Sequence, residues 1–230
     1  MTALKAQIKA CQRCPGLNIR RETESAPGYG SVDSPVVIVG QSLCHQCMNT
    51  QIPFTGGSGR FIDEALKDAR IAKDQIFITN VVHCHPHDYP RDNRPSHPHE
   101  IENCTSYLHS ELDIVEPRLI IGLGRDARNV LRSRYPENEP LPWPFKVPRA
   151  SGAGTPRLLL PPHPYWIMTR PKDIREQYVA SLVSALKWSF AKGSRWSQPV
   201  PDLKPTCDGM VPMPIEPQPK PDYLASEGDS

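Results

Sequence analysis

The chain has 230 residues, a formal net charge of +2 at pH 7 and seven cysteines, enough sequence for one sizeable domain with its own core. Its first ten residues lack the apolar stretch of a signal peptide, and no run of about 18 apolar residues occurs that would span a membrane. Without an export signal, the cysteines are expected to be reduced thiols or metal ligands rather than disulfides, and the expected compartment is the cytoplasm.

Charge and proline are unevenly distributed along the chain. Residues 197–230 hold six acidic residues against two lysines, a net charge of −4, and eight of the 27 prolines, so residues 1–196 carry +6. Proline fixes φ and removes a hydrogen-bond donor, and the apolar residues of 197–230 show no period. The sequence therefore predicts a disordered tail at 197–230 and one mildly basic globular domain at 1–196, which fits a polyanionic partner.

Strand and helix patterns alternate within the predicted domain. Taken in chain order, they are a strand at 35–40, a helix at 59–71, a strand at 75–82, a helix at 96–115, a strand at 118–124, a short helix ending at Leu131, a strand at 157–162 and a helix at 172–190. Such alternation implies right-handed crossovers and a three-layer α/β/α sandwich around a four-stranded parallel sheet.

Polar residues follow or end several of these strands. They are Gln41, Asn80, Cys84 and His163. Because functional residues in open parallel sheets gather at the carboxyl ends of the strands, these side chains are candidates for one site.

Four cysteines stand in two unequal pairs. Cys11 and Cys14 form a C-x2-C turn near the N-terminus, and Cys84 and Cys104 come much later. A zinc ribbon usually draws its ligands from two compact knuckles, whereas these cysteines would tie the N-terminal segment to the middle of the domain. The spacing favours four thiolates around an iron–sulfur cluster. A zinc site or unrelated buried thiols are the alternatives.

Four segments, in this order, carry a resemblance to a known family: CQRC, VVIVGQ…IPFTGGSGRFIDEAL, IFITNVVHCHP…NC and LLLPPHPYWIMTRP, between about Leu4 and Phe190. Together they are similar to the iron–sulfur (family 4-like) branch of the uracil-DNA glycosylase superfamily. The resemblance implies the uracil-DNA glycosylase fold, a [4Fe–4S] cluster on the four cysteines, and damaged single- or double-stranded DNA as partner. The implied reaction is hydrolysis of the N-glycosidic bond of a deaminated base, uracil in the first place, which leaves an abasic site.

The resemblance also assigns roles to three residues. Phe54 matches the phenylalanine that stacks on the flipped-out base, and Asn80 matches the asparagine that reads its edge, which are the groups an extruded base needs. His163 matches a family histidine; a hydrogen bond from it to the departing base would stabilise charge that develops in the transition state. On the residues alone, core packing of Phe54, strand-end capping by Asn80 and an ordinary loop histidine remain alternatives. The apolar run after His163 is either a wedge that enters the base stack or inward packing.

The first motif departs from the family pattern. Gln41 takes the place of a glutamate thought to activate or position water, and Cys47 falls at an acidic position. A carboxamide can hold water but cannot take its proton. Three readings stay open. In the first, His45 or a nearby aspartate acts as the general base in place of the glutamate. In the second the substrate is a nucleobase other than uracil, and in the third the protein binds lesions with little chemistry. Cys44 and Cys47 are either a metal or redox pair or two small residues in a turn.

Two further expectations concern partners. Arg91 and Arg94 lie in a histidine-rich loop and either contact phosphates or are solvated. The protein is expected to be a monomer without membrane contact, and its proline-rich tail is the candidate contact for a repair partner.

Overall fold

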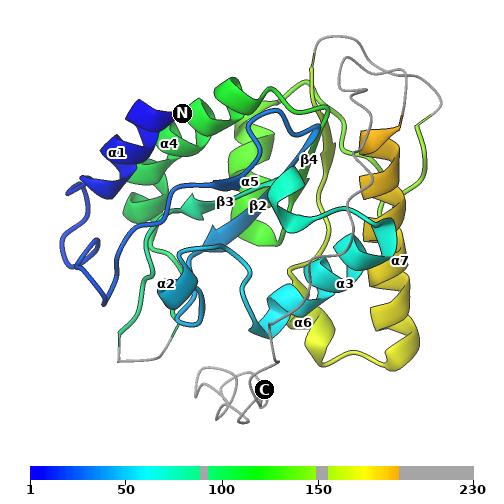
Figure 1. Ribbon diagram of the computed structural model, residues 1–230, viewed down its shortest axis with the longest axis horizontal. Helices are drawn as coiled ribbons and strands as arrows, with labels where there is room; N and C mark the ends of the chain where they lie inside the picture. The colour runs from blue at the N-terminus through cyan, green and yellow to red at the C-terminus, as the bar shows by residue number, and fades with distance from the viewer. Residues whose placement is uncertain (89–92, 149–154, 192–230) are drawn as a thin grey trace, which may run out of the picture. The chain divides into compact units, whose positions relative to one another are not determined.

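A computed structural model describes residues 1–88, 93–148 and 155–191 (Figure 1). The predicted tail at 197–230 and Arg91 lie outside the described residues. Among the residues that are described, none of the helices combines the length and the apolar character needed to cross a membrane.

The centre of the fold is a mixed sheet of five strands in the order β1-β3-β2-β4-β5. Strands β2 (Val36–Ser42), β3 (Phe77–Val82), β4 (Leu119–Gly122) and β5 (Arg157–Leu159) are parallel to their neighbours, which confirms the predicted four-stranded parallel sheet. In addition, β1 (Tyr29–Gly30) pairs antiparallel with β3 at one edge. Two residues are too short to carry a strand pattern, so the sequence gave no signal for β1.

The predicted helices are all present, with ends within a few residues of expectation. The long helices are α3 (Arg60–Ala69), α4 (Pro98–Val115), α5 (Arg125–Arg134) and α7 (Lys172–Phe190). Pro98 occupies the first turn of α4, where its missing N–H has no intrahelical partner to lose. Shorter elements that the sequence did not predict are α1 (Thr2–Lys9), α2 (Cys47–Thr50), α6 (Pro164–Met168) and two 3₁₀ turns, η1 (Gly57–Gly59) and η2 (Lys73–Gln75).

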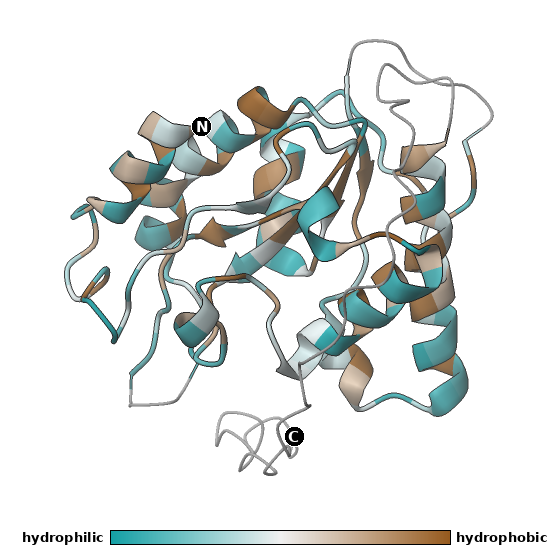
Figure 2. Ribbon diagram, in the orientation of Figure 1, coloured by the Kyte–Doolittle hydropathy of each residue, from teal (hydrophilic) through white to brown (hydrophobic). Residues whose placement is uncertain are grey.

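Alternating side chains of the strands divide the core into two layers. Val36 and Ile38 of β2 pack in one cluster with residues of α3 and α7, whereas Val37 and Val39 pack in another with residues of α4 and α5. The period of two in a strand sends successive side chains to opposite faces, so each face needs its own cover of helices. Figure 2 accordingly shows apolar strands enclosed between amphipathic helices, and the α/β/α sandwich is confirmed.

The strand order creates a crevice at one edge of the sheet. From β2 the chain moves to β3 on one side, and later to β4 on the other. In open α/β sheets, ligands bind outside the carboxyl ends of the strands at such a reversal of direction. The ends of β2, β3, β4 and β5 are therefore the first place to look for a site.

Candidate active site

The two predicted base-binding residues meet at a glycine on β2. The register of the sheet pairs Gly40 with Asn80, and a Cβ atom on Gly40 would collide with both Asn80 Oδ1 and the Phe54 ring. Asn80 and Phe54 are buried, at 2% and 9% exposure. Phe54 has a φ of 58°, which is rare for a bulky residue and marks a locally strained loop. Gly40 is thus what allows an amide and an aromatic face to converge.

A pocket of about 270 Å³ lies at the same edge of the sheet. Gln41, Gly124, Arg125, Asp126 and His163 contribute to its lining. The ring of His163 lies 6.3 Å from the ring of Phe54, centroid to centroid, so the pocket adjoins the corner formed around Gly40. The structure therefore brings Gln41 and His163 into one cavity next to Phe54 and Asn80.

Backbone contacts fix the segment that carries His163. The carbonyl of Pro162 accepts a hydrogen bond of 2.9 Å from the hydroxyl of Tyr178, and the carbonyl of Pro161 accepts one of 3.1 Å from the N–H of Gly124. His163 caps α6: its Nδ1 accepts from the N–H of Tyr165 at 3.2 Å. Since Nδ1 is the acceptor, the neutral ring carries its proton on Nε2, where it is available as a donor.

The surroundings of His163 keep its ring neutral. Burial lowers the pKa of His163 to about 4, and the Asp126 carboxylate offsets only part of that effect. Burial disfavours the charged imidazolium because the apolar surroundings solvate it poorly. At neutral pH the side chain is therefore an uncharged hydrogen-bond donor.

The sequence reasoning did not single out Asp126, Arg125 or Gly124 as part of the site. All three follow β4, and Gly124, with a φ of 87°, is packed against the Cβ of His163. A signal was present, because these residues come directly after a predicted parallel strand, as Gln41 and Asn80 do.

The loop that follows Gln41 is closed by a disulfide. Cys44 and Cys47 are joined, and the N–H of Cys47 donates to the carbonyl of Cys44 at 2.9 Å. The expectation that the cysteines are reduced or metal-bound is wrong for this pair, because the tight turn brings the two sulfurs together. His45, between them, donates its N–H to Asn93 and lies 5.9 Å from the ring of His85, and it is not among the residues that line the pocket.

The four cysteines that were predicted to bind a cluster gather on the side of β3 opposite to the pocket. Cys14, Cys84 and Cys104 are buried in the same apolar cluster, and Cys11 is half-buried nearby. Burial raises the pKa of Cys84 to about 12, and the thiols of the other three cysteines act on it in the same direction. The four sulfurs are therefore close enough to one another to interact electrostatically.

Whether these cysteines suit a metal group depends on their chemistry and spacing. Over the residues that the structure describes, no three Cys, His, Asp or Glu side chains are positioned to hold a single metal ion. Four neighbouring thiols are, however, the donor set of an iron–sulfur cluster, and the imidazole of His83 is hydrogen-bonded to one of them, Cys104. Burial raises the pKa of the Cys14 thiol, and the side-chain amide of Asn103, which donates to Cys14 Sγ at 3.4 Å, offsets part of that rise by favouring the thiolate form needed for binding. The donor set fits such a cluster.

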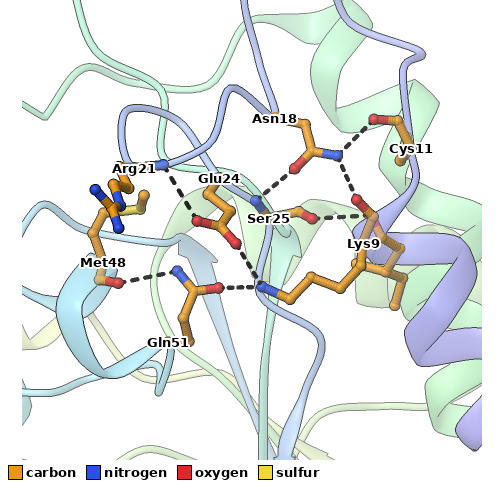
Figure 3. A network of polar contacts seen from close by, with 9 residues as sticks. Lys9, Cys11, Asn18, Arg21, Glu24, Ser25, Met48 and Gln51 are labelled. Atoms are coloured by element: carbon orange, nitrogen blue, oxygen red, sulfur yellow. Dashed lines mark hydrogen bonds and ion pairs between the residues drawn. The ribbon is translucent and has the colours of Figure 1, made fainter.

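A polar network joins the cysteine segment to the loop before Phe54 (Figure 3). The ammonium group of Lys9 donates to Glu24 and to Gln51, and the Asn18 amide donates to the carbonyls of Lys9 and Cys11, at 2.9 and 2.7 Å. Gln51 follows α2 directly, three residues before Phe54. These contacts tie residues 9–25 to the loop that precedes Phe54.

A buried ion pair supports the end of β3. Glu111 of α4 accepts hydrogen bonds from the N–H of Gly28 at 2.7 Å, from the hydroxyl of Thr79 and from His83 Nε2 at 3.1 Å. Burial alone would lower the pKa of His83, but the Glu111 carboxylate and the contact with the Cys104 thiol together outweigh it and raise that pKa to about 10. The pair anchors the end of β3. Asn80 lies in the chain before His83, and Cys84 follows it directly.

The sequence around this pocket is that of a known protein family. A sequence model described as the Uracil DNA glycosylase superfamily matches residues 27–187, a span that contains every residue of the pocket and of the Gly40 corner. The chain belongs to the uracil-DNA glycosylase superfamily.

Curated relatives in this superfamily are similar over about half of the chain. A Type-4 uracil-DNA glycosylase of Sulfurisphaera tokodaii is 31% identical over 59% of this chain and 59% of its own. That of Pyrobaculum aerophilum is 36% identical over 51% and 57%, and that of Thermotoga maritima 32% over 55% and 63%. A Type-5 uracil-DNA glycosylase of Pyrobaculum aerophilum is also similar, at 31% identity. The chain thus spans somewhat less than two thirds of the length of these relatives.

The surface beside the pocket of this superfamily member carries exposed aromatic groups. In α6, Tyr165 and Trp166 are 53% and 47% exposed, whereas Ile167 is buried. The Arg170 guanidinium lies 3.9 Å from the centre of the Trp166 ring. The two aromatic side chains therefore do not pack inward, which was one of the two readings of this run.

Arg94 is not a solvated loop charge. Its guanidinium donates to both oxygens of Glu100, at 2.9 and 2.6 Å, and its side chain is 13% exposed. A bidentate pair of this kind holds the loop to the start of α4. The Glu100 carboxylate thus occupies the guanidinium N–H groups that would otherwise contact a phosphate.

Proposed function

We propose that this chain is a DNA repair glycosylase that flips a deaminated base, uracil in the first place, out of DNA and hydrolyses its N-glycosidic bond. The observation that carries the proposal is the meeting of two half-sites: Phe54 and Asn80 converge at Gly40, and Gln41 and His163 line the adjoining pocket. A flipped base requires an aromatic face, an amide for its Watson–Crick edge and a donor for its departing charge in one place. The product is an abasic site.

In this proposal His163 acts on the leaving group. As the bond between the sugar and the base breaks, negative charge develops on the base oxygens. The neutral ring, protonated on Nε2, donates a hydrogen bond to one of these oxygens, and this bond stabilises the transition state more than the bound substrate. Removing one such donor typically lowers the rate by about 10²–10³. Gln41 holds the attacking water, since a carboxamide both donates and accepts.

The DNA-facing surface in this proposal is formed by α6 and its neighbours. Exposed aromatic side chains can insert into the base stack and occupy the space that the flipped base leaves. Tyr165 and Trp166, exposed beside His163, have this character. The charge of +6 on residues 1–196 favours a phosphate backbone as the partner.

Cys11, Cys14, Cys84 and Cys104 would hold a [4Fe–4S] cluster, which cross-links the N-terminal segment to β3 and α4. The cluster supplies structural support when bound, and the chain's own residues carry out the hydrolysis. Support for this assignment comes from the burial of three of the thiols in one apolar cluster and from the network of Lys9 and Asn18, which ties this segment to the loop that precedes Phe54. The protein acts as a monomer in the cytoplasm, with the tail at 197–230 as a contact for a repair partner.

Excision is tested on labelled oligonucleotides that contain one uracil, single- and double-stranded, with protein whose visible absorbance shows a loaded cluster. Strands are separated on a denaturing gel with and without alkali. Cleavage that requires alkali is expected, because a monofunctional glycosylase leaves an intact backbone at the abasic site. The His163→Ala variant serves as the matched control for contaminating activity.

A second candidate function follows from Gln41. Because a carboxamide stands where the family pattern implies a carboxylate, the pocket could bind a lesion or an abasic site without cleaving the bond. Uncut strands, together with tight binding of abasic DNA, would favour that function over excision.

A further inference from the structure

The acidic group that the first motif lacks is present elsewhere in the same pocket. Among the residues that line it, only Arg125 and Asp126 carry formal charges at neutral pH, given the neutral state of His163. Within the part of the chain that the structure describes, Asp126 supplies the single carboxylate of this lining. This inference rests on the proposed function, because it concerns how the same pocket performs hydrolysis.

The sheet order explains how Asp126 reaches the site. Strands β2, β4 and β5 are adjacent, and Gln41, Asp126 and His163 follow or end these three strands in turn. The parallel arrangement places all three residues at one edge, on the crevice side between β2 and β4 where the chain reverses its direction of travel. Asp126 therefore stands between the water-holding amide and the leaving-group donor in the order of the strands.

Asp126 is also positioned in a way that a surface acid is not. Its side chain is only 12% exposed, and among the described residues its ion-pair partner is Nε of Arg125, at a long distance of 3.5 Å and on a side chain that is itself 82% exposed. Exposed pairs of this length contribute little, so the carboxylate is not committed to a structural partner of comparable burial. It lies near enough to His163 to act on that ring electrostatically.

We propose that Asp126 is the catalytic carboxylate of this pocket and replaces the glutamate that Gln41 has displaced. Gln41 orients a water molecule through its carboxamide oxygen, and the oxygen of that water attacks C1′ of the flipped nucleotide. The bond from C1′ to the base breaks, and its electron pair leaves with the base as an anion that accepts a hydrogen bond from His163 Nε2. The water proton passes to Asp126, which later returns it to the base or to solvent.

The carboxylate has a second effect in the same step. Positive charge grows on the sugar ring as the base departs, and a fixed negative charge in a partly buried pocket stabilises it. A positioned general base or electrostatic partner contributes about 10²–10⁴ in rate. Asp126→Asn keeps the size of the side chain and removes both effects.

The test combines Asp126→Asn with Gln41→Glu in single-turnover excision of uracil from DNA. We expect Asp126→Asn to lower the rate constant by about 100-fold or more, while the dissociation constant for abasic DNA changes less than about threefold. In the double variant, the glutamate restores a carboxylate, so the rate should recover at least about tenfold over Asp126→Asn alone. Gln41→Glu is also measured in the wild-type background, and a gain there as large as the gain in the Asp126→Asn background would mean that Asp126 has only a structural role.

Asp173→Asn is the matched control, since Asp173 is also an acid in the first turn of a helix but is exposed and outside the pocket lining. It should leave the rate unchanged. An active wild type whose rate is unaffected by Asp126→Asn would overturn the assignment and leave the proposed function standing. A wild type that is inactive until Gln41→Glu is introduced would also overturn it, while supporting a glycosylase pocket. If neither the wild type nor Gln41→Glu excises uracil, the proposed function itself is overturned.

Discussion

His163→Asn tests the electrostatic environment of the pocket without reference to any substrate. The substitution removes the titrating ring but leaves a side chain that can cap α6, since asparagine is among the best residues at that position. The ring's pKa falls from its ordinary 6.5 to about 4 in the folded protein because of burial. Below pH 6.5 the unfolded chain therefore binds a proton that the folded chain refuses, so the wild type loses stability as the pH falls toward 4.

The size of this effect follows from the two pKa values. Each pKa unit corresponds to about 1.4 kcal/mol, so between pH 7 and pH 5 the wild type should lose about 2 kcal/mol relative to His163→Asn. The two proteins are compared by urea unfolding at several pH values in this range, each with a loaded cluster. Taking the difference between them cancels the titration of all other groups.

His99→Asn is the control for this experiment, because His99 is exposed on α4. A pH dependence that His99→Asn shares with His163→Asn would not arise from the pocket. If the curves of the wild type and His163→Asn run parallel between pH 7 and pH 5, His163 is not held neutral by burial, and the account of a neutral leaving-group donor fails with it.

Other predictions concern the parts that support the pocket. Glu111→Gln should lower the free energy of unfolding by about 3–5 kcal/mol, because it removes one charge of a buried pair; Glu102→Gln, at an exposed position of the same helix, should change urea unfolding by less than about 0.5 kcal/mol. Gly40→Ala should abolish uracil excision while circular dichroism stays unchanged, because its Cβ collides with the two base-binding side chains; retained excision would contradict that geometry. Cys84→Ser should lose bound iron and visible absorbance, and Cys47→Ser should keep both; equal iron content in the two variants would argue against the cluster ligands.

The first motif illustrates where sequence reasoning stopped. The replacement of a family glutamate by Gln41 was visible in the sequence, and it indicated that the carboxylate was missing or supplied from elsewhere. Candidates for the replacement were His45, four residues away, and an unspecified aspartate. In the structure His45 turns toward His85, whereas Asp126, 85 residues further along the chain, lines the pocket. When a site is built from the ends of several strands, residues far apart in the sequence line it together, so proximity in sequence is a poor guide to its members.

The cysteines also divide into what the sequence predicts and what the structure adds. Their spacing predicted which four could act together, and the burial of Cys14, Cys84 and Cys104 in one apolar cluster agrees with that grouping. A redox pair at Cys44 and Cys47 was one of two alternatives, and the disulfide between them was decided only by the turn geometry that brings the two sulfurs into contact.

The sequence by itself determined the layers of this protein and predicted which residues recognise the base. Local periodicity specifies strands and helices, because the burial of each side chain follows directly from the period of its element, and the four motifs named Phe54, Asn80 and His163. Tertiary structure alone decided which side chains face one another. The order of β2, β4 and β5 brings Gln41, Asp126 and His163 to one edge, and burial there lowers the pKa of His163. Both effects depend on contacts between residues far apart in the chain, which no local pattern records.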